Sequence, residues 1–328
     1  MAIQDKDLFW YGSATMPDDD TVLNIGGAIS LTKKITWFDI DSDTLKAVSS
    51  SASDTAVVIT AYGRNSGGAK ISEAKTLTGT SFTAVTTATF ERLMKAVASG
   101  TAAVGDIAMV MNTAERSNTA VGVGADYIDL DASANATDDY YTGMVIRIDS
   151  ATAGAYQLRT IVKYVGASKR AYISRDWGTT PTGTITFSVF KGVLFDALAT
   201  KITEVRRPFY DTATPTSGSR NYYEKFFIKN THATLDLTNG QLKEVSGGAS
   251  AKIDFLVAAT LDDTGSNGAG NNRQVAPSGT FDSADKNIAN SGTLTHATAQ
   301  GVWLKLTLAS TDAAADTTYS MQVAGQSV

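Results

Sequence analysis

The sequence contains no cysteine and only two histidines, His232 and His296. The lack of cysteine excludes disulfide bridges, thiolate metal sites and cysteine nucleophiles, so the fold must be stabilised by packing. Histidine is the usual acid–base group near neutral pH. Both histidines lie next to threonine in loop or strand-end surroundings, and no Gly-x-Ser-x-Gly nucleophile motif is present. We therefore assign no catalytic residue and expect a protein that is not an enzyme.

Charge is also scarce. Charged residues make up 19% of the chain, below the roughly 25% of an average globular protein. Lysine and arginine number 28 against 33 aspartates and glutamates, which gives a net charge of −5. No overall basic field is available to hold a polyanion, so we expect no direct nucleic-acid binding. No stretch approaches the ~20 apolar residues of a membrane-spanning helix, and the first residues do not resemble a signal peptide. We expect no membrane association and a protein that stays where it is made.

Apolar residues instead recur with period two in short runs between Gly, Asn, Asp and Ser clusters, which is typical of β-strands. In Val302–Leu308, four aliphatic side chains share one face while Lys305 and Thr307 point to the other. Turn signals such as Arg64–Gly68 and Val165–Ser168 predict hairpins. Only Thr89–Val97 has helical spacing, and a strand is the alternative there because Ala- and Thr-rich sequence surrounds it. The same strand pattern predicts further strands at 56–62, 71–78, 144–148, 157–165, 171–174, 184–190, 225–229 and 253–257.

A chain of 328 residues exceeds the usual size of one hydrophobic core. Composition divides it into residues 1–118, an N-terminal arm plus an immunoglobulin-like β domain, 119–193, a small β-sandwich or barrel, and 194–328, a C-terminal β-sandwich. We predict an all-β protein with two to three sandwich-like or barrel-like domains, Greek-key or immunoglobulin-like topology and little helix. The mixed polar and apolar stretch from Ala2 to Ala28 is interpreted as an arm that adds a strand to a partner's sheet.

One loop is rich in oxygen donors. Asp262–Asn272 combines carboxylates, amides and glycines, but it lacks the final bidentate glutamate of an EF-hand. A solvated or partner-docked loop is the favoured interpretation, and whether the loop binds an ion stays open. Asp18–Asp20 is interpreted as a solvated turn. Gly122–Gly124 lacks the third glycine of a dinucleotide motif. We therefore predict no metal site and no cofactor.

Aromatic residues often occur as adjacent pairs, whose members point to opposite faces of an extended chain. One member of each pair is either covered by another domain of the chain or exposed for a partner. Because aromatic residues and arginine are enriched at interfaces, the predicted contact residues are Trp10, Tyr11, Arg206, Arg207, Phe209, Tyr210, Tyr222 and Tyr223.

Three segments of the middle region carry a resemblance. They are Asp138–Ile148, with its Gly-Met strand, Gln157–Ile161, with Gln-x-Arg, and Ser174–Trp177, with Arg-x-Trp. Together they resemble a compact β module of tailed-bacteriophage virion proteins. The Val57–Leu77 hairpin looks like the immunoglobulin-like repeat of phage decoration and tail proteins. Tyr222–Asn230 and Gln300–Leu308 resemble the last domain of phage structural proteins.

The resemblance implies a virion structural protein without cofactor or chemistry, assembled in the bacterial host cytoplasm. A capsid decoration or cement protein that binds the major capsid protein is the leading hypothesis, and it implies a homo-oligomer, with a trimer as one option. A neck, collar or tail component that contacts other virion proteins is the alternative. A glycan-binding module that uses Tyr140, Tyr141 or Trp177 is a hypothesis of another class.

Overall fold

The computed structural model describes residues 2–37, 39–247, 252–312 and 319–327. It contains 49% strand and 2% helix, which confirms the all-β prediction. Within the described residues, no helix has the length and apolar character needed to cross a membrane. The chain forms two compact units. Unit 1 combines Met1–Ile35 with Pro208–Val328, and unit 2 is Thr36–Arg207.

This division differs from the predicted boundaries after residues 118 and 193. Residues 2–28, interpreted from sequence as a free arm, contribute strands to unit 1. Tyr11 pairs with Phe227 on one side and with Lys34 on the other. The arm prediction is therefore corrected, because a strand with partners on both sides is part of the sheet. Removing it would break the sheet rather than release a tether.

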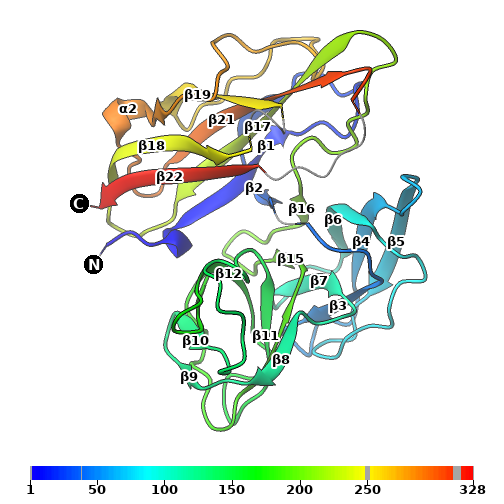
Figure 1. The fold of residues 1–328 in the computed structure, drawn as a ribbon, viewed down its shortest axis with the longest axis vertical. Helices are drawn as coiled ribbons and strands as arrows, with labels where there is room; N and C mark the ends of the chain where they lie inside the picture. The colour runs from blue at the N-terminus through cyan, green and yellow to red at the C-terminus, as the bar shows by residue number, and fades with distance from the viewer. Residues whose placement is uncertain (1, 38, 248–251, 313–318, 328) are drawn as a thin grey trace. The chain divides into compact units, whose positions relative to one another are not determined.

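Unit 1 contains a large antiparallel sheet and a small one (Figure 1). In the small sheet, β18 lies between β20 and β22. A short 3-10 turn, η1 (Asp5–Asp7), and a helical turn, α2 (Ala289–Gly292), are its only described helical elements. The large sheet has the order β19 (Ile253–Leu261), β21 (Ala299–Ala309), β17 (Ser219–Asn230), β1 (Leu8–Thr15) and β2 (Gly26–Ile35). The strands of the small sheet are β20 (Lys286–Asn287), β18 (Leu237–Ser246) and β22 (Ser320–Ser327).

The longest strand, β17, is central to unit 1. It pairs with β21 from Ser219↔Ala309 to Lys229↔Ala299. Its residues 222–228 are all buried, so both faces of the strand are covered. This explains why its sequence is a nearly continuous run of large side chains rather than a strict alternation.

Unit 2 is built from three groups of antiparallel strands. A hairpin sheet has the order β16 (Glu204–Arg206), β6 (Arg92–Gly100), β4 (Val57–Arg64) and β5 (Lys70–Thr76). A three-stranded sheet has the order β15 (Gly192–Phe195), β7 (Ile107–Met111) and β3 (Leu45–Ser49). A seven-stranded sheet has the order β8 (Arg116–Thr119), β14 (Thr186–Phe190), β11 (Val145–Ser150), β12 (Leu158–Val165), β13 (Arg170–Ile173), β10 (Tyr127–Asp129) and β9 (Gly122–Val123).

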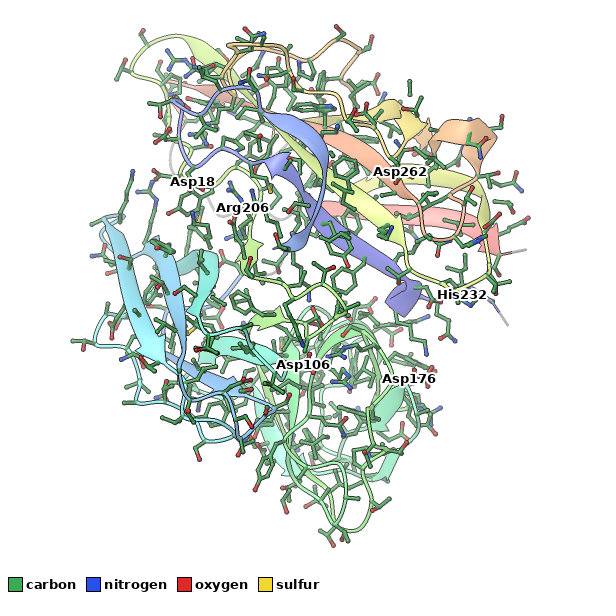
Figure 2. All side chains as sticks on the ribbon, turned by 180° about the vertical axis from the view of Figure 1, so that it is seen from behind. Asp18, Asp106, Asp176, Arg206, His232 and Asp262 are labelled. Atoms are coloured by element: carbon green, nitrogen blue, oxygen red, sulfur yellow. The ribbon has the colours of Figure 1, made fainter. Side chains whose placement is uncertain are left out.

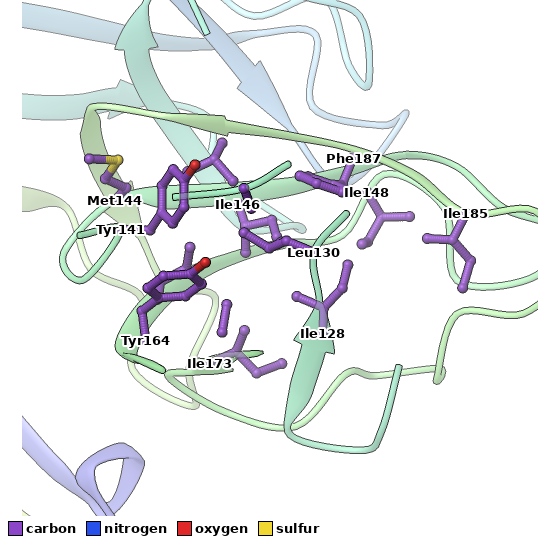
Figure 3. Packing of buried hydrophobic residues seen from close by; sticks show 14 of the residues in the cluster. Ile128, Leu130, Tyr141, Met144, Ile146, Ile148, Tyr164, Ile173, Ile185 and Phe187 are labelled. Carbon is purple, nitrogen blue, oxygen red and sulfur yellow. The ribbon is translucent and has the colours of Figure 1, made fainter. Parts of the chain in front are cut away.

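The seven-stranded sheet encloses its own hydrophobic core (Figure 3). Ile128, Ile146 and Ile161 are fully buried there. The rings of Tyr141 and Tyr164 meet edge to face, with centroids 4.9 Å apart, a favoured geometry for aromatic pairs. Burial raises the pKa of the Tyr164 hydroxyl to about 12. This core shows that residues 116–190 close on themselves as one β module.

Of the two interpretations of Thr89–Val97, the helix is wrong and the strand is confirmed for its second half, because residues 92–100 form strand β6 between β4 and β16. Leu93, Lys95 and Ala96 are buried while Met94 and Val97 are half-buried. The apolar residues matched a helical spacing by coincidence, and pairing on both sides decides the conformation. Tertiary pairing routinely overrides weak local preference of this kind.

Candidate functional site

The oxygen-rich loop that follows β19 surrounds the ammonium group of Lys225. The Nζ atom of Lys225 lies 2.5 Å from the Oδ2 atom of Asp263. It also donates to the backbone oxygens of Gly27 and Gly265, each at 2.9 Å, and to that of Asp263 at 3.3 Å. The Lys225 side chain is 0% exposed. The Lys225 ammonium is thus the cation that these oxygens surround, in the place where a bound metal ion would otherwise lie.

Aromatic rings complete the surroundings of this ammonium. Its nitrogen lies 4.8 Å from the ring centre of Phe227 and 5.7 Å from that of Trp303, within the range of cation–π attraction. Burial lowers the pKa of Lys225, while the hydrogen bond to Asp263 opposes that shift. The arrangement is a buried ion pair with its remaining donors satisfied by carbonyls, which is the condition for tolerating a charge in a protein interior.

The neighbouring carboxylate of Asp262 does not contact Lys225 but binds a backbone group. Asp262, labelled in Figure 2, accepts a hydrogen bond from the backbone N–H of Ala299 at 2.9 Å. Over the described ranges, no group of three or more histidine, aspartate or glutamate side chains is arranged to hold a metal ion. The Lys225 ammonium is a cation that the Asp262–Asn272 loop contacts, through Asp263 and Gly265.

The rest of the loop is fixed within unit 1. The side-chain amide of Asn267 donates to the backbone oxygen of Asn272 at 2.6 Å. The next residue, Arg273, donates to Asp20 at 2.6 Å and to the backbone oxygen of Tyr210 at 2.8 Å, with its side chain 3% exposed. Asp19 forms a local turn in which hydrogen bonds from Thr21 lower the pKa of its carboxyl. Asp18–Asp20 is thus a turn, of which Asp20 anchors a buried arginine.

A second buried charge cluster lies in unit 2 around Asp106, labelled in Figure 2. Arg159 donates to its Oδ2 atom at 2.9 Å, and Arg175 forms an ion pair with its Oδ1 atom. The backbone N–H of Ala197 also donates to Oδ1 at 2.7 Å. Burial raises the pKa of Asp106 against the opposing effect of Arg175. Burial, followed by repulsion from Arg175, lowers the pKa of Arg159 to about 10.

The same cluster accounts for the Gln-x-Arg and Arg-x-Trp segments noted in the sequence. Arg159 donates to the backbone oxygen of Asp176 at 2.8 Å and lies 5.4 Å from the ring centre of Trp177. Gln157 accepts a hydrogen bond from the N–H of Gly178 at 2.6 Å. These polar residues therefore fasten the turn after β13 to strand β12 and, through Asp106, to the start of β7. Their role is structural.

Most of the predicted contact residues are not at the surface. Tyr11, Arg206, Phe209, Tyr222 and Tyr223 are buried. The interface prediction is corrected for these five, because a partner could reach them only by displacing the chain's own packing. The hydroxyl of Tyr222, for example, donates to the backbone oxygen of Ala213 at 2.9 Å.

The other three predicted contact residues, Trp10, Arg207 and Tyr210, are half-buried. The Trp10 ring packs on Phe226 at 5.4 Å, and Arg207 forms an ion pair with Asp39. The aromatic residue Phe38, which the sequence pairs with Trp37, lies outside the described residues. The structure does not bring the predicted contact residues together as one exposed patch on either unit.

The proposed glycan platforms also differ from expectation. Trp177 is 6% exposed and Tyr141 is 3% exposed, whereas Tyr140 is 40% exposed. A stacking platform needs an open ring face, so the first two residues are excluded as sugar-binding surfaces. Tyr140 donates its hydroxyl to Glu115 and packs edge to face on Tyr141.

Both histidines bind neighbouring groups. The Nδ1 atom of His232, labelled in Figure 2, accepts a hydrogen bond from the backbone N–H of Leu235 at 2.9 Å and shapes a turn. The Nδ1 atom of His296 lies 2.8 Å from the Oδ1 atom of Asp236. Hydrogen bonds from His296, the backbone N–H first, lower the pKa of Asp236.

Comparison with known proteins adds no relative. No family model, no curated protein and no solved structure matches the chain.

Proposed function

We propose that the chain is a structural subunit of a tailed-bacteriophage particle, and specifically a decoration protein that binds and stabilises the major capsid shell. The observation that carries the proposal is the module from residue 116 to residue 190. Its sequence resembles a phage virion module. Two arginines of the resembling segments, Arg159 and Arg175, both bind the buried carboxylate of Asp106. Within this module Arg159 donates to the backbone oxygen of Asp176 and Gln157 accepts from Gly178, so these polar groups hold the turn after β13 to β12.

The physical character of the chain supports the same proposal. A protein that reinforces a shell must keep its shape under load, and here cysteine is absent, so disulfides cannot contribute. Buried polar networks with satisfied hydrogen bonds rigidify a fold and specify one arrangement. The network centred on Lys225 in unit 1 is of this kind. In the cluster centred on Asp106 in unit 2, both carboxylate oxygens are satisfied, while the Nε atom of Arg175 has no hydrogen-bond partner among the described residues.

Electron cryomicroscopy of the particle whose genome encodes the chain tests this proposal. The decoration role predicts density that fits each all-β unit on the outside of the shell, repeated hundreds of times. About a dozen copies or fewer, at the neck or tail, would favour the alternative structural position. Complete particles that lack such density at both places would refute the proposal. The glycan hypothesis is not pursued, because two of its three nominated rings are buried.

A further inference from the structure

Strand β22 forms one edge of the small sheet in unit 1. It pairs with β18 from Leu237↔Ser327 to Ser246↔Ser320. Among the described residues, no strand and no loop backbone pairs with its other side. In an antiparallel strand, alternate residues point their N–H and C=O groups to that side. The strand therefore presents a row of hydrogen-bonding groups to a further strand.

The composition of β22 is unusual for such an edge. Its sequence is Ser-Met-Gln-Val-Ala-Gly-Gln-Ser, which contains no charged residue and no proline. Lysine, proline and inward-pointing charges are the usual protection of an open edge against pairing with another chain. None of these is present in β22.

Two other edge strands, β5 and β19, are protected. In β5, Lys70, Glu73 and Lys75 carry charge. The Glu73 carboxylate accepts hydrogen bonds from the N–H groups of Thr87 and Ala88, and Lys75 donates to the backbone oxygen of Val85 at 2.7 Å, so residues 85–88 cover that strand. Strand β22 differs from β5 because it carries no charged residue.

The edge strand β19 is covered in another way. It carries Asp254. The backbone N–H of Phe255 donates to the backbone oxygen of Asp282, and the backbone N–H of Asp282 donates to that of Phe255. An incoming strand would have to displace that segment. No comparable segment bridges β22 among the described residues.

We propose that β22 pairs antiparallel with β22 of a second copy of this chain, across a two-fold axis. Such an interface must be self-complementary, because the same patch serves both subunits. An uncharged strand meets this condition, since antiparallel self-pairing opposes no like charges. Gln322 and Gln326 are exposed, and their amides can act as both donor and acceptor. The Oε1 atom of Gln326 accepts a hydrogen bond from Asn239 of the same sheet, which leaves its NH2 group as the donor for a partner. A charged partner strand would find no opposite charge here.

The inference does not rest on the proposed function. A strand of eight residues is only about 27 Å long, and an interface well below ~1,200 Å² is weak. We therefore expect a weak, reversible dimer whose population rises with protein concentration. Sedimentation velocity of the full chain up to about 0.5 mM follows that rise.

Opposite-charge variants test the pairing directly. Gln322→Lys with Gln326→Lys places like charges on both copies, as does Gln322→Glu with Gln326→Glu. Each variant alone should raise the dissociation constant about tenfold. An equimolar mixture of the lysine and glutamate variants should restore dimers. The matched control is Ser72→Lys with Thr76→Lys, at the same four-residue spacing in the protected edge strand β5, where both positions are exposed. It should leave association unchanged.

The mixture also guards against misfolding, because unfolded variants cannot rescue one another. Circular dichroism of each variant should match that of the unmodified chain. A chain that stays monomeric throughout the concentration range would overturn the inference. So would variants that associate normally, or a mixture that fails to dimerise. Loss of particle binding without any self-association would assign β22 to a different protein partner and would likewise refute self-pairing.

Discussion

Replacing Lys225 by methionine tests the interpretation of the oxygen-rich loop. Methionine keeps most of the volume of the side chain but removes the ammonium, which donates to Asp263, Gly27 and Gly265. Three backbone acceptor contacts and one carboxylate contact then lose their donor. The loop should loosen where it meets β17.

The magnitude follows from the burial of the pair. Removing one partner of a fully buried ion pair costs about 3–5 kcal/mol. The Asp263 side chain is 24% exposed, so water can solvate part of the abandoned charge. We expect Lys225→Met to lower the free energy of unfolding of unit 1 by about 2–4 kcal/mol. Adding Asp263→Asn should recover part of that loss, because it removes the unpaired charge.

A second lysine on the same sheet provides the control. Lys305 on β21 lies 2.5 Å from Asp254 on β19, but these side chains are 21% and 34% exposed. Lys305→Met should therefore cost only about 0–1 kcal/mol. Because the chain has two units, native-state hydrogen exchange of β17 amides is the appropriate assay, since it reports unit 1 separately. Equal small losses for the two variants would refute the buried-cation interpretation.

Two further predictions concern unit 2. A β-carbon on Gly63 would lie 2.0 Å from the backbone oxygen of Arg92, so Gly63→Ala should destabilise unit 2 by about 1–3 kcal/mol in urea unfolding. The control is Gly67→Ala, whose β-carbon would have its nearest contact at 3.4 Å, and it should change the stability by less than about 0.5 kcal/mol. Equal effects of the two substitutions would contradict the packing at the β4–β6 bulge. The Arg116 hydrogen bond lowers the pKa of the Asp131 carboxyl below its ordinary value. Since the unfolded chain regains that ordinary value of ~3.9, the stabilisation is complete above about pH 4 and is lost as the pH falls through the lowered native value. The stability of Asp131→Asn should therefore fall less steeply with decreasing pH than that of the unmodified chain. An identical pH dependence of the two proteins in acid would contradict this prediction.

Local pattern predicted nine of the strands. The hairpin of β4 and β5, the β11–β14 strands and β21 follow from alternation and turn residues, because one face of each strand meets a core. Strand β6 was missed because a helical spacing arose there by chance. The short strands of unit 2 and the small sheet of unit 1 were not predicted, and strands β1 and β2 were not predicted as parts of the large sheet.

Long-range partners could not be predicted from local pattern. Strand β1 pairs with residues more than 200 positions away, as Tyr11↔Phe227 shows. No feature of the sequence around β1 indicates which strand it pairs with. Likewise Asp106 meets Arg159 and Arg175, which lie 53 and 69 residues further along the chain. The sequence identified the arginines and the oxygen-rich loop as notable but could not show that each is satisfied inside the fold.

Lys225 itself was missed as a site residue. The available signal was a lysine inside a run of buried aromatic residues, Tyr222–Phe227, in a chain that also contains an unexplained acidic loop. A charge in a strand covered on both faces requires a partner. The identity of that partner depends on the tertiary fold.

We propose that the chain is a building component of a virus particle. Quantitative mass spectrometry of particles, purified by density gradient from cells that express the whole phage genome, tests this role. The chain should band with the particles at a fixed ratio to the major capsid protein, and that ratio should survive repeated purification. A chain found only in the unassembled lysate, with none in infectious particles, would contradict it.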